Sequence, residues 1–164
     1  MNIKPEIKYG LFMGLGVCLW ILLEFILGFH TTRMNIGRWS GYFSVIIPIV
    51  CLYFGIQETK AETYWQKVKA GIVMVSIASV IIALFFVVYN LFINPDWIEQ
   101  GIAVEKQRLS EIGATEEEII AAEQTMRQFF SIEMQVTGAF LGTLIEGCIL
   151  TLLIAALVKK KESV

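Results

Sequence analysis

The chain has 164 residues and a net charge of −2, and 56% of its residues are hydrophobic while only 17% are charged. A soluble domain carries about a quarter charged residues, so this composition excludes an ordinary soluble globule and a disordered chain. No run of basic residues follows the pattern of a nucleic-acid backbone, and we expect no nucleic-acid partner.

Four apolar segments are long enough to cross about 30 Å of hydrocarbon at about 1.5 Å per residue. They are residues 9–29, 39–56, 71–93 and 134–158. Only two of the chain's 28 charged residues lie within them. The second segment is the shortest and contains Pro48, which predicts a kinked helix. The sequence therefore predicts an all-α, polytopic membrane protein with a single four-helix transmembrane domain.

A water-exposed helical hairpin, residues 95–133, is predicted between the third and fourth spans. Asn94, followed by Pro95 and an acid, has the form of a helix start. Thr115 and Glu118 have the spacing of a capping box, which predicts the start of the second arm. Because no helix breaker follows before residue 137, this arm is expected to continue without interruption into the fourth span.

The basic residues predict the orientation. Four spans place the N-terminus, the second loop and the C-terminus on one side, which then holds eight Lys and Arg residues, against five on the other side. Basic residues concentrate on the cytoplasmic side of membrane proteins. We therefore expect a multi-pass membrane protein with both termini cytoplasmic and the hairpin outside.

Three stretches of the chain carry a family resemblance. The sequence TYWQKVKAG at residues 63–71 precedes a long apolar span, INPD at residues 93–96 precedes a polar helical segment, and a Gly-rich last span ends in Lys159, Lys160 and Lys161. In this order the parts resemble the domain-of-unknown-function 4199 family of bacterial membrane proteins. The resemblance implies a four-helix inner-membrane protein and brings no catalytic or binding residues, because the family has no established activity.

Glu24 and Glu146 are the charged residues within the spans, and they form the candidate intramembrane polar site. An ionised carboxylate in hydrocarbon costs about 2.5 kcal/mol or more, so both side chains are expected to face protein or water. Counted from the cytoplasmic ends, the two acids are expected within a helical turn of each other in height. The polar side chains available as partners are Tyr53, Ser76, Ser79, Tyr89 and Thr143.

Two GxxxG pairs, Gly10 with Gly14 and Gly138 with Gly142, are the predicted helix-packing residues. Glycine at this spacing allows two membrane helices to approach closely. Each pair lies within about 80° of one of the two acids on a helix of 3.6 residues per turn. The acids are therefore expected beside packing surfaces.

No motif of a known enzyme class occurs, so no enzymatic activity and no cofactor are expected. The three cysteines lie in apolar spans without a CxxC pattern, and His30 is interpreted as an interfacial residue, so no metal site is expected. The hairpin region carries nine acids against three bases. That excess could bind a basic partner or divalent cations, but a solvated helix face is the favoured interpretation.

The leading hypothesis is a small inner-membrane protein of structural or interaction type. Its expected partners are the lipid bilayer and a second copy or another membrane protein, and the sequence names no small-molecule or ion substrate. The alternative is a small proton- or cation-coupled transporter that uses Glu24 and Glu146. A polar path to these acids would favour transport, and its absence would favour a scaffold.

Overall fold

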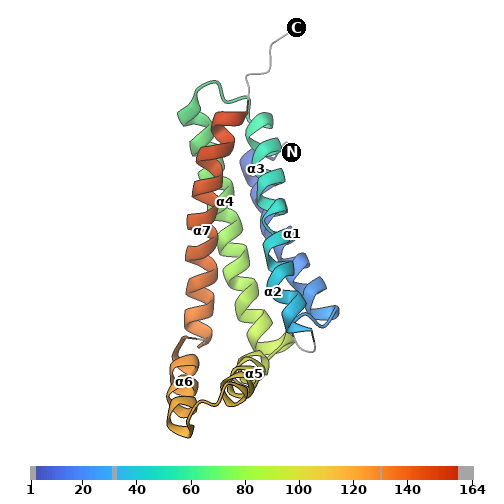
Figure 1. Ribbon diagram of the computed structural model, residues 1–164. Coiled ribbons are helices and arrows are strands. Elements are labelled where there is room, and N and C mark those ends of the chain that lie inside the picture. Colours follow the sequence, from blue (N-terminus) through green and yellow to red (C-terminus); the bar gives the residue numbers. More distant parts are fainter. Residues whose placement is uncertain (1–2, 31–32, 130, 159–164) are drawn as a thin grey trace. The chain divides into compact units, whose positions relative to one another are not determined.

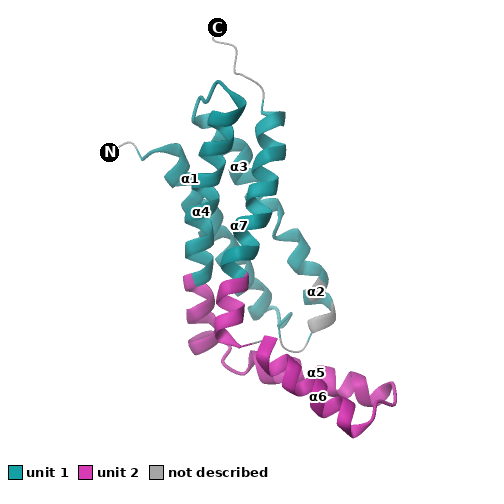
Figure 2. Ribbon diagram, turned by 90° about the vertical axis from the view of Figure 1, so that its left-hand side faces the viewer, with its two compact units in different colours: residues 1–83, 139–164 teal, residues 84–138 magenta. Residues whose placement is uncertain are grey.

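The computed structural model describes residues 3–30, 33–129 and 131–158, and every element among them is a helix (Figure 1). In chain order the elements are α1 (Pro5–Ile26), α2 (Met34–Phe43), α3 (Ile46–Glu58), α4 (Tyr64–Val88), the π-helical turn η1 (Tyr89–Ile93), α5 (Trp97–Glu111), α6 (Glu116–Phe129) and α7 (Ile132–Leu157). The chain divides into two compact units, residues 1–83 with 139–164 and residues 84–138 (Figure 2). Each unit is described by itself.

Four helical segments in the described part of the chain are long and apolar enough to cross a membrane. They are Pro5–Ile26, Trp39–Glu58, Tyr64–Ile93 and Ile132–Leu157. The prediction of an all-α chain with four such helices is therefore confirmed. The first helix ends at Ile26 rather than at residue 29, because Gly28 turns the chain with a φ of +77°.

The second span consists of two helices, and the break lies before Pro48. Ser44 and Val45 separate α2 from α3, and the Ser44 hydroxyl donates to the Gly41 carbonyl at 2.6 Å. Pro48 then occupies the third position of α3, where the missing N–H costs no intrahelical bond. Proline is therefore accommodated in a first helical turn instead of kinking a continuous helix.

Helix α4 is the centre of the first unit. The buried core combines Met13 of α1, Leu52 of α3, Met74 of α4 and Ile154 of α7. Gly10 of α1 lies against Ile77 of α4, and Gly14 lies against Ile81. Because the residue numbers rise together along this contact, α1 and α4 run parallel.

Helix α7 packs on α4 in the opposite direction. An added Cβ at Gly71 would lie 2.4 Å from Thr151, and one at Gly147 would lie 2.5 Å from Val75. These distances are shorter than real contacts, so both backbones approach where only glycine fits. The ammonium of Lys67, buried near the start of α4, donates to the carbonyl of Val158 at 2.5 Å and so caps the negative end of the α7 dipole.

In the second unit α5 packs against α6. Thr115 and Glu118 form the predicted capping box, in which the Thr115 N–H donates to Glu118 at 2.8 Å and the Glu118 N–H donates to the Thr115 hydroxyl. Helix α5 starts at Trp97 with Asp96 as its N-cap residue, whereas Asn94, the N-cap suggested by the sequence, donates its side-chain N–H to the Tyr89 hydroxyl at 3.3 Å.

The expectation of an uninterrupted second arm is wrong. Helix α6 ends at Phe129 and α7 begins at Ile132, with residue 130 outside the described residues. The Ser131 hydroxyl accepts from the N–H of Met134 at 3.3 Å, so a serine N-cap starts a new helix here.

Candidate functional site

Glu24 lies two residues before the end of α1 and is 5% exposed. Trp20, one helical turn earlier on the same face, donates its indole N–H to Glu24 Oε1 at 2.9 Å. The other carboxyl oxygen, Oε2, lies 3.3 Å from Nε2 of His30. Among the described residues the partners of Glu24 are thus Trp20 and His30, and none of the hydroxyl side chains expected from the sequence is found bonded to it there.

The turn after α1 brings His30 back to Glu24. The N–H of Gly28 donates to the Phe25 carbonyl and the N–H of Phe29 donates to the Glu24 carbonyl, both at 2.9 Å. These two bonds, together with the left-handed conformation of Gly28, form a Schellman motif. Glycine adopts this conformation without steric cost. Gly28 therefore positions the imidazole over the buried carboxyl.

The imidazole of His30 donates to or accepts from the carboxyl of Glu24, depending on its tautomer. The indole N–H of Trp20 can only donate, so it always presents a donor to Glu24 Oε1. A protonated imidazole would form an ion pair with the carboxylate. His30 is therefore part of a polar cluster with Glu24 and Trp20, rather than an isolated interfacial residue. No group of three or more metal-ligating acids, cysteines or histidines occurs among the described residues.

Glu146 has a different environment. It lies near the middle of α7, its side chain is exposed, and no polar partner contacts it in the described part of the chain. The neighbouring Gly147 lies at the level of Val75 in α4, and Gly10 of α1 lies at the level of Met74. Glu24 is 14 residues beyond Gly10 along α1, which separates the two acids by about 21 Å in height. The expectation of similar heights is wrong, because α1 starts at Pro5 and Glu24 lies near its far end.

The two predicted glycine pairs also differ. Gly10 lies against Ile77 and Gly14 lies against Ile81, both of α4. An added Cβ at Gly138 or Gly142 would meet no described atom within 4 Å. Within the chain α7 approaches its neighbour through Gly147 instead, and Gly142 and Glu146 share the uncovered side of the helix.

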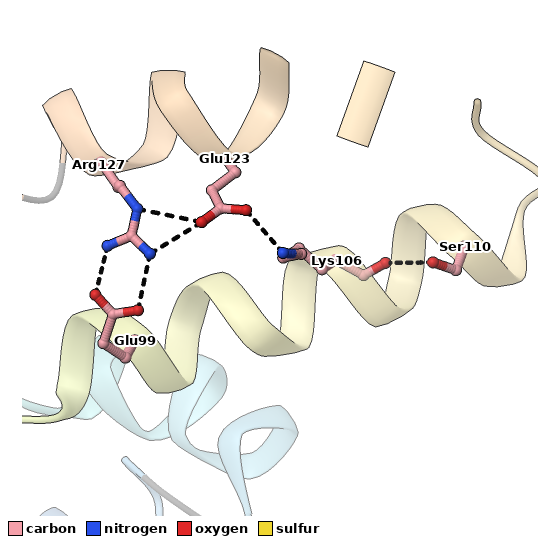
Figure 3. A network of polar contacts seen from close by, with 5 residues as sticks. All are labelled: Glu99, Lys106, Ser110, Glu123 and Arg127. Atoms are coloured by element: carbon pink, nitrogen blue, oxygen red, sulfur yellow. Dashed lines mark hydrogen bonds and ion pairs between the residues drawn. The ribbon is translucent and has the colours of Figure 1, made fainter. Parts of the chain in front are cut away.

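The acids of α5 and α6 are organised by two bases (Figure 3). Arg127 donates to Glu99 at 3.0 Å and to Glu123 at 2.9 Å, and Lys106 donates to the second oxygen of Glu123 at 2.7 Å. The Arg127 guanidinium lowers the pKa of Glu99. The ammonium of Lys106 and then Arg127 lower the pKa of Glu123. Part of the acidic excess is therefore used to join the two helices.

The comparisons with known proteins assign the chain to a family. The family model described as Protein of unknown function (DUF4199) matches residues 8–160. No curated protein and no solved structure matches the chain. The matched stretch includes most of α1, the whole of the other three apolar helices, both acids of the candidate site and the helices α5 and α6. On this evidence the chain belongs to the DUF4199 family.

Proposed function

We propose that this protein is an interaction protein of the bacterial inner membrane that assembles with a second copy of itself through the uncovered face of α7. The carboxyl of Glu146 near the middle of that helix is exposed and has no polar partner among the described residues, and this observation carries the proposal. Ionisable residues in membrane spans face other protein or a water-filled cavity, because exposure to lipid is costly.

The residues around Glu146 support a helix as the covering group. Gly142 and Gly138 lie one and two turns before Glu146 on the same side of α7, and a Cβ at either would meet open space. A second helix could therefore approach closely along this side. A protonated carboxyl has both a donor and an acceptor, so two copies of Glu146 are chemically complementary to each other.

Disulfide formation between copies in membranes tests the proposal. In a chain whose native cysteines are replaced, Ile145→Cys on the uncovered face should give a covalent dimer on mild oxidation. Leu19→Cys is the matched control, because Leu19 is similarly exposed but lies on α1. Adding Gly142→Leu should abolish the dimer. Equal cross-linking at both positions, or none at Ile145→Cys, would contradict the assembly through α7.

The contact between Glu24 and His30 favours a second function, proton- or cation-coupled transport. A buried carboxyl beside an imidazole is a pair of groups that can bind and release a proton. In this alternative Glu24 and Glu146 act at separate heights. Glu24→Gln and Glu146→Gln should each abolish proton or cation flux in proteoliposomes without unfolding the chain. Flux that both variants retain, or no flux by the native protein under any gradient, would exclude the transport role.

A further inference from the structure

The first unit contains an open groove of about 620 Å³ at the end where α1 and α4 begin. Its walls come from the first turn of α1, the loop between α3 and α4, and the first three turns of α4. The residues that matter for its chemistry are Glu6, Lys60, Glu62, Lys69 and Val73. The groove is far from both Glu24 and His30, which lie at the other end of α1.

The charges that line the groove balance. Lys60 and Lys69 supply two positive charges, and Glu6 and Glu62 supply two negative charges. Among the described residues Glu6, Lys60 and Lys69 have no ion-pair partner, whereas the nearby Lys8 is paired with Glu58 at 2.6 Å. A groove that presents charges of both signs is complementary to a ligand that also carries both.

An apolar surface continues from the groove along α4. Val73 lines the groove and is 45% exposed, and Val80, 49% exposed, lies seven residues further on the same face. Ile7 of α1, next to Glu6, is also exposed. The polar groove therefore lies where the charged start of α4 meets its apolar part, as the headgroup region of a bilayer meets the hydrocarbon.

We infer that this groove binds a phospholipid whose headgroup carries a phosphate and a primary ammonium group, as in phosphatidylethanolamine. Lys60 and Lys69 would bind the phosphate through charge-assisted hydrogen bonds, and Glu6 and Glu62 would accept from the ammonium. One acyl chain would lie along Val73 and Val80. An anionic lipid without the ammonium would leave the carboxylate of Glu6 without a counter-charge, so the groove discriminates against phosphatidylglycerol.

Native mass spectrometry of the full chain with equal amounts of phosphatidylethanolamine and phosphatidylglycerol tests the inference. The native chain should retain phosphatidylethanolamine preferentially. Lys60→Gln with Lys69→Gln should weaken this retention about tenfold, since two charged contacts to the phosphate are lost. Glu6→Gln should shift the preference toward phosphatidylglycerol, because the groove then has a net positive charge. Lys4→Gln, at an exposed lysine near the same end but outside the groove, should change nothing.

Three outcomes would overturn the inference. The first is equal retention of the two lipids by the native chain. The second is unchanged retention by the folded Lys60→Gln, Lys69→Gln variant, with the thermal midpoint as the measure of folding. The third is displacement of the lipid by soluble glycerophosphoethanolamine at the same concentration, which would assign the groove to a soluble phosphate compound instead of a membrane lipid.

Discussion

Gly28 holds the backbone conformation on which the Glu24 cluster depends. Its φ of +77° is unfavourable for a residue with a Cβ. Gly28→Ala should lower the stability of the protein by about 1 kcal/mol. Thermal unfolding in detergent measures the change, and Gly101→Ala is the matched control. Gly101 lies inside α5 with open space around it, so the same substitution should there be neutral or stabilising. Equal effects at the two positions would show that the turn tolerates a side chain.

The contacts of Glu24 could in part be predicted from local sequence. Trp20 lies four residues before Glu24, so a helix alone brings them together. Gly28 near the end of an apolar helix is a helix-stop signal. It predicts a turn that brings the next residues back toward Glu24. The long-range contact of Lys67 with Val158 has no such signal, because it depends on how α4 and α7 pack.

At the scale of elements, α7 carries one glycine that packs on α4 and others that face open space. A Cβ at Gly147 would lie 2.5 Å from Val75, which is fully buried and has no room to move. Gly147→Ala should therefore destabilise the chain by about 1–3 kcal/mol. Gly142→Ala should leave the stability of the monomer unchanged or raise it, because nothing lies within 4 Å. Chemical denaturation of the two variants in detergent at monomeric dilution distinguishes them, and the opposite ranking would refute the packing of α7.

The ion pairs between α5 and α6 make their association dependent on pH. Since the pKa values of Glu99 and Glu123 are lowered below their usual value of 4.5 in the folded chain, the stabilisation is present above pH 4.5. It is lost as the pH falls through the lowered values. Spin labels at Val104→Cys and Ile120→Cys, exposed positions on the two helices, should give a narrow distance distribution at pH 7 and a broader one at pH 3.

Arg127→Gln is the control for this pH effect. Without the guanidinium, Glu99 loses its partner and Glu123 retains only Lys106, so the distribution should already be broader at pH 7 and change less with pH. High salt should act in the same direction, because these side chains are exposed and screened. Distributions that are identical at pH 7 and pH 3 in the native background would refute the role of the ion pairs.

Spans are easier to predict than the faces through which they pack. The transfer free energy of a segment adds along its length, so apolar runs identify membrane-spanning helices. In α4 and α7 most side chains are apolar and the polar ones are spread around the helix, so no polar stripe marks the side toward the protein. The sequence therefore does not show whether α7 packs on its neighbour through Gly138 and Gly142 or through Gly147, which lies beside α4 as Gly71 lies beside α7. Ser131, whose hydroxyl accepts from the N–H of Met134, is a residue type that favours the start of a helix. Serine also occurs within helices, so its presence alone does not predict the break at this position.

At the scale of the whole molecule, the proposed orientation places the turn between α5 and α6 outside the cell membrane. The eight-to-five distribution of basic residues is its basis. Gly113 lies in that turn with open space around it, and its φ of +79° costs a residue with a Cβ about 1 kcal/mol, so the thermal midpoint of the labelled variant is measured as well. In a chain without native cysteines, Gly113→Cys should react with an impermeant thiol reagent added to intact cells, whereas Thr63→Cys in the loop before α4 should react only after lysis. The reverse pattern would invert the orientation.

The bond between Lys67 and Val158 also has a consequence in time. Its two residues are 91 positions apart in the chain. At a translation rate of 5–20 residues per second, Val158 is therefore synthesised about 5 to 18 s after Lys67. During that interval the carbonyl that accepts the hydrogen bond from Lys67 does not yet exist, so the ammonium must stay hydrated at the membrane surface. The start of α4 therefore stays at the boundary between membrane and water until α7 has been synthesised. Lys67 becomes buried only when α7 packs against α4.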